Sequence, residues 1–420
     1  MKIVCIGGGP AGLYFALLMK KLDQSHDITV LERNAPDDTF GWGVVFSDKT
    51  LSYIQRTDEE SYTRITESFE RWENVDVVHR DRKISIRGNK FSGIARIKLL
   101  NILQERAEAL GVRLRFRTNV ADPAEFAREA DLIVGADGVN SEVRARYSRF
   151  FQPELSLRSN KYIWYGTNQL FHGLTLTFRE SPAGVFAAHS YKFNQTTSTF
   201  IVECDAATWA SAGFERMPDA QTRDYLAEVF RRDLGGHPLL SNNSKWINFL
   251  LVKNRRWHHE NVVLLGDALH TAHFSIGSGT KLALEDAIAL HEAFAAGLDV
   301  KEALLEFERT RKPIIEAYQQ AAYESLLWFE HAADYVHLDP VPFAYKLMTR
   351  SKKIDYENLK KRDPQFIELY DESQKGIKGE KGKGEREEST SVIARRFLRP
   401  FPLPLSPINQ ALTRIDWRAP

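Results

Sequence analysis

The chain has 420 residues, which is long enough for two or three domains with a large buried core. Its formal net charge is +1 and 43% of its residues are hydrophobic, so the composition gives no sign of a general surface for nucleic acids or membranes. The only cysteines are Cys5 and Cys204, which excludes a disulfide framework and a cysteine metal cluster, and no metal site is expected.

The first segment has the pattern of a strand, a glycine-rich turn and a helix. Residues 2–6 are a short apolar strand, residues 7–12 read GGGPAG, and residues 13–19 are an apolar helical stretch. In such a turn the glycines allow a tight bend, a close approach to a pyrophosphate, and close packing of helix on strand. After a second apolar strand, at 27–31, Glu32 can accept hydrogen bonds from ribose hydroxyls. This pattern predicts a dinucleotide-binding unit.

Further strands and helices of the same domain follow later in the chain. Residues 97–110 have the apolar spacing of a helix, residues 112–116 alternate as a strand does, and residues 131–135 form another apolar strand. This last strand leads into Asp137-Gly138, at the edge where ligands collect in open α/β sheets. The alternative is a plain turn that caps a helix.

A change in residue composition indicates a second sheet. Residues 161–204 are rich in aromatic and β-branched residues without helices between them, which predicts a separate, largely antiparallel layer. The chain then returns to the first domain through the buried strand 262–265, which leads into Gly266-Asp267. The Asp267 carboxylate can bind a ribityl hydroxyl, and the helix opened by Gly277-Ser278-Gly279 can turn its N–H groups toward a flavin ring. This second motif indicates that the dinucleotide is FAD.

The C-terminal part begins with helices. Residues 301–329 are predicted to be helical, with a kink or a break at Pro313. Residues 374–388 are Lys, Glu and Gly in alternation with almost nothing to bury, which predicts a disordered linker. The tail after Arg395 is rich in proline.

The order of the motifs, Gly7-x-Gly9-x-x-Gly12, then Asp137-Gly138, then Gly266-Asp267, resembles the single-component FAD-dependent aromatic hydroxylases related to para-hydroxybenzoate hydroxylase. Four further stretches look like a narrower group of that family, which includes salicylyl-CoA 5-hydroxylases, anthraniloyl-CoA monooxygenases and the violacein-pathway flavin hydroxylase. These stretches are 41–46 (GWGVVF), 160–167 (NKYIWYGT), 198–204 (STFIVEC) and 273–279 (HFSIGSG). The family usually has proline where this chain has Phe274, a departure that the narrower group shares.

The resemblance implies an α/β fold with a Rossmann-like FAD-binding domain of the glutathione-reductase type, an inserted, mainly antiparallel β-sheet substrate domain, and C-terminal helices. The FAD-binding domain is expected in three parts, at 1–75, 96–155 and 259–300. A substrate-side hairpin is expected at 76–95 and the β-sheet domain at 156–258. The remaining segments are C-terminal helices at 301–370, a disordered charged linker at 371–394 and a proline-rich tail at 395–420.

The resemblance also implies which residues hold FAD. The glycines of the first turn would contact the pyrophosphate, Glu32 the adenosine ribose, and Asp267 the ribityl chain. The full set of cofactor-binding residues implied by the family pattern is Gly7, Gly9, Pro10, Ala11, Gly12, Glu32, Arg33, Arg96, Val120, Asp137, Gly138, Gly266, Asp267, Gly277 and Gly279.

The implied reaction is an FAD- and NAD(P)H-dependent hydroxylation of an aromatic ring through a flavin C4a-hydroperoxide. The chain shows no second Rossmann motif, so NAD(P)H is expected to bind transiently. The expected substrates are molecular oxygen and an aryl-CoA thioester such as salicylyl-CoA, which would give gentisyl-CoA. One alternative is an indole-derived biosynthetic intermediate. Others are an FAD-dependent reductase that does not use oxygen, and a nucleotide-binding module without catalysis.

Residues near the substrate are expected on the sheet and beside the flavin loop. Tyr165, His189 and His273 are the catalytic candidates and Phe200 is a candidate substrate contact, because such side chains can orient a phenol or an aniline. His189 or Tyr165 could also help to deprotonate a ring substituent. The alternative for each of these residues is a role in packing.

A run of basic residues also bears on the substrate. Arg80, Arg82 and Lys83 lie between His79 and Lys90, where apolar and charged residues alternate as in a surface hairpin. The resemblance to acyl-CoA hydroxylases implies that some of these cations hold the phosphates of CoA. The alternative is a solvated surface.

The sequence also bears on where the protein works. No charged leader precedes a long apolar segment at the N-terminus, and no apolar run has the length of a bilayer span. We therefore expect a cytoplasmic protein that binds neither nucleic acid nor, stably, a membrane, and that is a monomer or a homodimer.

Overall fold

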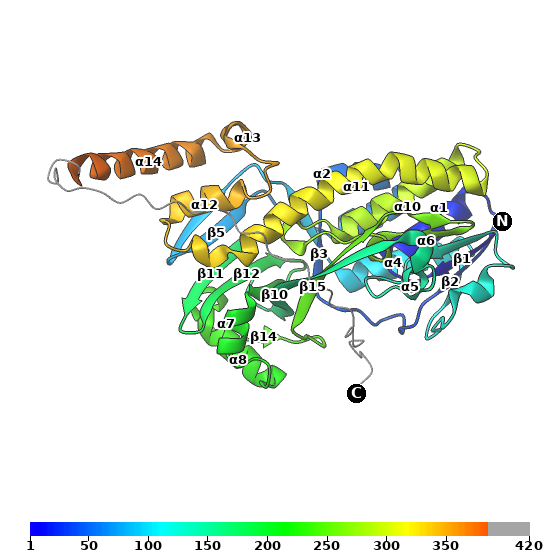
Figure 1. Cartoon of the computed structure of the whole chain (residues 1–420), viewed down its shortest axis with the longest axis horizontal. Helices are drawn as coiled ribbons and strands as arrows, with labels where there is room; N and C mark the ends of the chain where they lie inside the picture. The colour runs from blue at the N-terminus through cyan, green and yellow to red at the C-terminus, as the bar shows by residue number, and fades with distance from the viewer. Residues whose placement is uncertain (385–420) are drawn as a thin grey trace, which may run out of the picture. The chain divides into compact units, whose positions relative to one another are not determined.

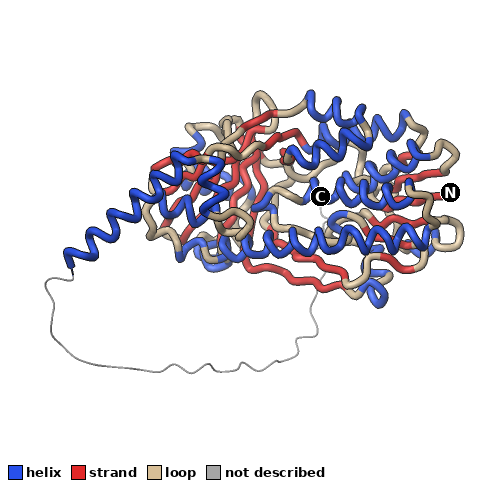
Figure 2. Tube along the Cα trace, turned by 90° about the horizontal axis from the view of Figure 1, so that it is seen from above, coloured by secondary structure: helices blue, strands red, loops and turns tan. Residues whose placement is uncertain are grey.

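Three β-sheets form the framework of the unit that comprises Met1–Ser373 (Figure 1). The computed structural model describes residues 1–384, and the chain from Gln374 onward belongs to a second unit. Helices cover the sheets, as the trace in Figure 2 shows. In the described residues, no helix combines the length and the apolar character that a membrane span requires.

The first sheet has six strands in the order β16-β17-β9-β1-β2-β8. All neighbours are parallel except the edge pair β16 and β17. Its strands are β1 (Lys2–Ile6), β2 (Asp27–Leu31), β8 (Arg113–Arg115), β9 (Leu132–Gly135), β16 (His258–His259) and β17 (Val262–Leu264). They come from three separate stretches of the chain, and this mostly parallel sheet with its helices agrees with the α/β fold class expected from the motifs.

Three helices accompany this sheet: α1 (Pro10–Leu22), α4 (Arg96–Ala109) and α10 (Gly279–Ala295). Helix α1 lies at the centre, because it contacts both α4 and α10 and its residues 10–19 are all buried. Two short helices follow β9, α5 (Glu142–Arg146) and α6 (Ser148–Phe151). This arrangement places the N-termini of α1 and α10 together at the carboxyl ends of β1 and β17.

The second sheet has eight strands in the order β14-β10-β13-β12-β11-β5-β6, with β15 paired to β10. Its pairs are antiparallel except for β5 with β11. The strands are β5 (Val75–His79), β6 (Arg82–Ile86), β10 (Pro153–Thr167), β11 (Leu174–Ser181), β12 (Gly184–Lys192), β13 (Ser198–Cys204), β14 (Leu239–Leu240) and β15 (Ile247–Asn254).

Alternation along these strands divides their side chains between two faces. One face buries Ile163, Phe186 and Val202 in a cluster with residues of α8 and α9. The helices on this side are α7 (Ala206–Ser211), α8 (Asp219–Val229) and α9 (Arg231–Leu234). The other face carries Leu176 and Ala187, which pack against Phe329 and the C-terminal helices.

A small antiparallel sheet, β3-β7-β4, connects the two larger ones. Its strands are β3 (Gly43–Phe46), β4 (Glu70–Trp72) and β7 (Phe91–Ala95), and helices α2 (Asp48–Thr57) and α3 (Glu59–Glu67) lie between β3 and β4 in the chain. Gly43 bridges to the large sheet, because its N–H donates to Thr199 Oγ1 at 3.0 Å and its carbonyl accepts from the Tyr191 hydroxyl at 2.8 Å.

The C-terminal helices refine the sequence expectation in two places. Helix α11 (Val300–Glu330) is continuous, so of the kink or break expected at Pro313 the structure excludes the break. Helices α12 (Pro340–Met348) and α13 (Tyr356–Arg362) follow, and α14 (Pro364–Gly384) is helical over the first part of the segment expected to be a disordered linker at 371–394. The rest of that linker and the tail at 395–420 lie outside the described residues.

Candidate active site

The two glycine motifs meet although they are far apart in the sequence. Gly266 has a positive φ of +59°, and a Cβ at this position would lie 3.2 Å from Ala11 Cβ of α1 and 3.4 Å from Ala283 Cβ of α10. The turn after β17 therefore lies directly against the start of α1. Residues from the beginning and from the middle of the chain therefore contribute to one site.

Bare backbone surrounds this site. The helices α1 and α10 begin after Gly9 and Ser278, and neither start is capped by a side-chain hydrogen bond. A Cβ on Gly9, Gly138 or Gly279 would meet no atom within 4 Å. Space is thus open beside the starts of two neighbouring helices, whose first N–H groups have no capping side chain, and this fits the phosphates and the anionic ring edge of a flavin dinucleotide.

Glycine is required at two points of the first turn. Gly7 has φ +111°, and a Cβ there would lie 2.2 Å from the Ala136 carbonyl oxygen. A Cβ on Gly12 would lie 2.2 Å from the Gly7 carbonyl oxygen. These contacts hold strand β1, helix α1 and the loop after β9 at backbone distance. Pro10 is the first residue of α1, where its missing N–H removes no helical hydrogen bond.

Glu32 lies at the end of β2 beside this turn. Its carboxylate accepts a hydrogen bond from the Gly8 N–H at 2.7 Å and from the N–H and side-chain amide of Asn34 at 2.8 and 2.7 Å. The neighbouring Arg33 is exposed and Val120 is buried. The geometry thus keeps Glu32 next to the glycine turn, where a ribose would lie.

Asp137 accepts hydrogen bonds from the start of helix α5, whose N-cap residue is Ser141. The Asp137 carboxylate accepts from the Ser141 hydroxyl at 2.5 Å and from the N–H groups of Glu142 and Val143 at 2.7 and 3.2 Å. Burial raises the pKa of Asp137, and these hydrogen bonds oppose that effect. The carboxylate is occupied by the start of α5, so within this pair Gly138, with φ +82°, is the residue whose backbone borders open space.

Arg144 ties this loop to the second glycine motif. Its guanidinium donates to the carbonyl oxygens of Ala268 at 2.9 Å and Val139 at 2.5 Å. The side chain is buried, and burial lowers the pKa of Arg144 while Asp137 and Asp267 oppose that effect. One arginine therefore joins the loops that follow β9 and β17.

Asp267 is the free carboxylate of the site. Its side chain is exposed and accepts no hydrogen bond from any residue between 1 and 384 that the structure describes. The surrounding protein atoms raise the pKa of Asp267, while Arg96 and His270 oppose this. Arg96, the first residue of α4, is half-buried, and its desolvation lowers its own pKa while Asp267 opposes this. A carboxylate and a guanidinium thus face one region, as the hydroxyls of a ribityl chain would require.

The Gly266 turn has its own buried support. Asp286 of α10 accepts from the Gly266 N–H at 3.3 Å, lies 2.7 Å from His270 Nε2, and accepts from Arg311 Nε at 2.9 Å. Burial opposes the ionised form, but His270 and Arg311 hold the pKa of Asp286 below its usual range. The ion pair fixes the backbone that presents Asp267.

The loop 273–279 faces the large sheet. The Phe274 ring lies 4.6 Å from the Tyr162 ring, 5.2 Å from the His189 ring and 4.2 Å from the His273 ring. Gly277 has φ +61°, and a Cβ there would lie 3.9 Å from Val45 Cβ of β3. An aromatic surface thus borders the start of α10, where a flavin ring would lie.

A buried carboxylate lies behind this aromatic surface. Glu203 of β13 is 2% exposed and accepts from Asn160 Nδ2 at 2.8 Å. Its oxygens lie 3.3 Å from His189 Nε2 and 3.8 Å from His273 Nε2. Burial opposes its ionisation, but His273, His189 and Asn160 together lower the pKa of Glu203. Burial also lowers the pKa of His273 to about 4, although Glu203 opposes this.

Two candidates from the sequence lie on the wrong face of the sheet. Tyr165 and Phe200 are paired across β10 and β13 and point toward α8 and α9. The Tyr165 hydroxyl donates to Asp219 at 2.8 Å, and Phe200 packs against Phe230 at 5.3 Å. Because successive side chains of a strand point to opposite faces, the substrate role expected for these two residues does not fit this geometry.

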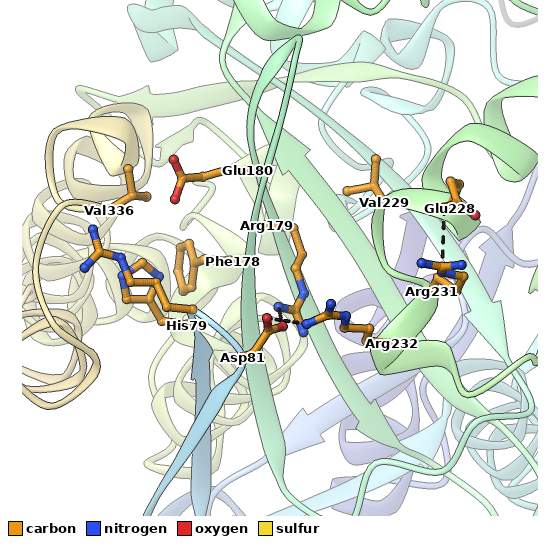
Figure 3. A pocket seen from close by; sticks show the side chains of 11 residues that line it. His79, Asp81, Phe178, Arg179, Glu180, Glu228, Val229, Arg231, Arg232 and Val336 are labelled. Carbon is orange, nitrogen blue, oxygen red and sulfur yellow. Dashed lines mark hydrogen bonds and ion pairs between the residues drawn. The ribbon is translucent and has the colours of Figure 1, made fainter.

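The basic hairpin β5–β6 borders a separate cavity of about 320 Å³. Figure 3 shows Asp81 next to the guanidinium groups of Arg179 and Arg232, with which it forms ion pairs, and Arg231 paired with Glu228. Of the three basic residues expected to bind CoA, only Arg80 lines this cavity. Arg82 does not line it, and Lys83 is exposed and lies 3.5 Å from Asp76.

Sequence reasoning missed the residues that the sheet brings to the flavin loop. Tyr162, Asn160 and Glu203 share the face that carries His189, and Arg350 reaches the same region from beyond α12. One signal was visible: Glu203 is a lone carboxylate inside the apolar run 198–204. No pattern in the sequence connects Arg350 with this site.

Comparison with known proteins agrees with this geometry. A family model described as FAD binding domain matches residues 1–322. The chain is 44% identical to a salicyloyl-CoA 5-hydroxylase of Streptomyces sp over 383 residues, which cover 88% of this chain and 73% of that protein. It is 35% identical to a protodeoxyviolaceinate monooxygenase of Chromobacterium violaceum, with 84% and 95% covered. The structure of 2-methyl-3-hydroxypyridine-5-carboxylic acid oxygenase has a TM-score of 0.66 at 19% identity, with 86% and 97% covered.

The protein is thus a flavoprotein oxidoreductase, and the chain belongs to the FAD-binding family of flavin-dependent monooxygenases. It is an FAD-dependent aromatic monooxygenase, which incorporates one atom of O₂ into an aromatic ring and uses NAD(P)H as the reductant.

Proposed function

We propose that this monooxygenase hydroxylates the ring of an aryl-CoA thioester, with salicyloyl-CoA as the first candidate and gentisyl-CoA as its product. The observation that carries the proposal is the 44% identity to salicyloyl-CoA 5-hydroxylase along 73% of that protein. The aromatic surface formed by Tyr162, Phe274 and His189 beside the flavin loop supports it, because it suits a flat ring.

Bound FAD supplies the redox and oxygen chemistry, and the chain supplies its binding and its orientation. We propose that the backbone of residues 7–12, including Gly7, Gly9, Pro10, Ala11 and Gly12, binds the pyrophosphate at the start of α1. Glu32, Arg33 and Val120 would lie along the adenosine. Arg96, Gly138, Gly266 and Asp267 would hold the ribityl region, and Gly277 and Gly279 the ring edge, while Asp137 orders its loop from behind.

We propose that the substrate ring lies against Phe274, in front of His189 and His273. These side chains are buried or half-buried, so a bound ring in this place is shielded from water. A histidine next to this aromatic surface can also accept the proton of a ring hydroxyl.

For the CoA part, we propose that Arg80, which lines the cavity bordered by the hairpin β5–β6, contacts a phosphate. Arg80 is the residue to test first, because its partner Asp339 lies 3.5 Å away and is 77% exposed, which makes this ion pair weak. Arg82 and Lys83 could contribute from the same hairpin at longer range.

A second candidate function is hydroxylation of an indole-derived intermediate. It is favoured by the 35% identity to the protodeoxyviolaceinate monooxygenase, 95% of which is covered by the match. The two candidates differ in one testable way, because only the first requires a CoA thioester.

The deciding experiment measures anaerobic reduction of the purified holoenzyme by NADH and by NADPH. Salicyloyl-CoA, free salicylate and an indole-type substrate are added separately, and oxygen-18 gas then labels any product. We expect salicyloyl-CoA to accelerate reduction strongly and to give a product with one labelled atom. Acceleration by the indole compound alone would select the second candidate, and oxygen consumption without a hydroxylated product in every arm would contradict both.

The CoA contact predicts the effect of one substitution. Arg80→Gln should raise the KM for salicyloyl-CoA about tenfold, because a charge-assisted hydrogen bond contributes about 1.5–3 kcal/mol. The value of kcat and the flavin absorption spectrum should not change. Lys90→Gln is the matched control, since Lys90 lies on the same segment but does not line the cavity. Equal effects of both variants would contradict the contact.

A further inference from the structure

A directed chain of hydrogen bonds ends on His273. Arg350 Nε donates to Ser325 Oγ at 2.8 Å, the Ser325 and Ser275 hydroxyls lie 2.7 Å apart, and Ser275 Oγ lies 2.8 Å from His273 Nδ1. Arginine can only donate, so the hydroxyl protons of both serines are free to point toward His273. The Ser275 backbone N–H also donates to His273 Nδ1, at 3.4 Å. Nδ1 of His273 is therefore an acceptor.

This arrangement leaves His273 without a nitrogen that could accept a proton from the substrate. With Nδ1 accepting, the ring proton lies on Nε2, which faces Glu203 Oε1 at 3.8 Å. Nδ1 is occupied by the hydroxyl and the N–H of Ser275, Nε2 faces Glu203 at a distance longer than a hydrogen bond, and the side chain is 2% exposed. His273 thus shapes the flavin loop but has no lone pair left for a substrate.

His189 has the opposite arrangement. Its Nε2 lies 3.3 Å from Glu203 Oε2, and an ionised carboxylate can only accept, so Nε2 carries the proton. Its Nδ1 makes no hydrogen bond to another residue in the described range 1–384 and keeps its lone pair. The ring lies 5.2 Å from Phe274 in an edge-on arrangement, next to the proposed place of the substrate.

Glu203 can impose this tautomer because its own position is fixed. Asn160 donates to Oε1 at 2.8 Å, and the carboxylate lies in the middle of the sheet between β10 and β12. Arg350 lies at the other end of the hydrogen-bonded chain, where burial lowers its pKa and Glu203 opposes that effect. The same carboxylate therefore holds Nε2 of both imidazoles toward itself, which leaves Nδ1 of His189 as the nitrogen without a hydrogen-bond partner among the described residues.

We propose that Glu203 is a positioning residue that makes His189, and not His273, the proton acceptor for the ring hydroxyl of the substrate. In this step the O–H bond of the ring substituent breaks, its proton moves to His189 Nδ1, and the electron pair stays on the oxygen as a phenolate. The resulting imidazolium is paired with Glu203, in the way that a carboxylate orients the histidine of a catalytic triad. The step rests on the proposed hydroxylation of a ring that carries a hydroxyl group.

The first test needs no turnover. In the holoenzyme labelled with nitrogen-15 histidine, long-range proton–nitrogen correlation spectra at neutral pH report the tautomer of each ring, with signals assigned through His189→Gln and His273→Gln. We expect a proton on Nε2 of both rings. Glu203→Gln should change the tautomer of His189, because an amide can donate as well as accept, and Ser275→Ala should change only the signals of His273. A proton on Nδ1 of His189 in the wild-type protein would overturn the proposal.

The second test is kinetic. Glu203→Gln should lower kcat for hydroxylation of salicyloyl-CoA on the order of 100-fold, the range of general-base catalysis. The rate of flavin reduction by the nicotinamide, measured without substrate, should stay close to that of the wild type, whereas a general structural defect would lower it as well. If Glu203→Gln loses FAD, Asn160→Ala removes only the hydrogen bond that fixes the carboxylate and gives the same two readouts. Absence of salicyloyl-CoA turnover by the wild type would contradict the proposed function, while the spectra would still decide the role of Glu203.

Discussion

At the first turn, an added methyl group should have different effects on Gly12 and on Gly9. A Cβ on Gly12 would collide with the Gly7 carbonyl oxygen at 2.2 Å, whereas a Cβ on Gly9 would point into open space. Gly12→Ala should therefore lower the free energy of unfolding by about 1–3 kcal/mol and should also lose FAD, because the start of α1 must shift. The measurements are urea unfolding and the flavin content of the purified protein.

Gly9→Ala is the matched variant at the same turn. We expect it to keep the stability of the FAD-free protein and to bind FAD more weakly, because the new methyl group occupies space that the phosphates need. Equal losses of stability in both variants would show that the turn does not have the geometry described.

Among the elements, helix α3 shows how one carboxylate joins three helices. Asp58 caps α3 through the Ser61 N–H at 3.1 Å, and it lies 3.0 Å from Lys21 of α1 and 3.2 Å from Arg106 of α4. Burial opposes its ionisation, but Arg106, Ser61 and Lys21 lower the pKa of Asp58 to about 2. The ionised form is therefore more stable in the folded protein than in the unfolded chain.

This linkage predicts a pH-dependent loss of stability in Asp58→Asn. A shift from 3.8 to about 2 corresponds to about 2 kcal/mol of unfolding free energy, which is fully present above pH ~4 and declines as the pH falls toward 2. Urea unfolding of both proteins at neutral pH and near pH 3 measures the difference. A difference that does not shrink in acid would contradict the assigned ion pairs.

For the molecule as a whole, the site joins stretches that are distant in the chain. The loops that follow β1, β9 and β17 meet around one place, and Arg144 connects two of them. A ligand bound there contacts all three loops only in the folded state. FAD should therefore stabilise the unit formed by Met1–Ser373 as a single body.

Removal of the cofactor tests this statement. The FAD-free protein should melt at a lower temperature than the holoenzyme, and added FAD at 100 times its Kd should restore about 2.7 kcal/mol of unfolding free energy. Differential scanning calorimetry measures the change, and Gly9→Ala should show a smaller response at the same FAD concentration. A melting temperature that does not depend on FAD would contradict a site shared by the three loops.

The difference between Tyr165 and Tyr162 shows where prediction from sequence fails. Both tyrosines lie in the run 160–167, and nothing in the residue types tells which of two alternating faces meets the flavin loop. The register of β10 with β13 settles this, because it places Tyr162 opposite Glu203 and Tyr165 opposite Phe200. A shift of one residue would exchange the two faces.

Local patterns by themselves determined the elements and the cofactor. A turn such as 7–12 needs glycine for steric reasons that act within a few residues, so its strand, its helix and its dinucleotide could be recognised directly. Only the tertiary structure decided that Gly266 lies against Ala11, that Asp137 accepts hydrogen bonds from the start of α5, and that Glu203 lies between two histidines. These are contacts between residues far apart in the chain, and they depend on sheet register and helix packing, which no short stretch of sequence encodes.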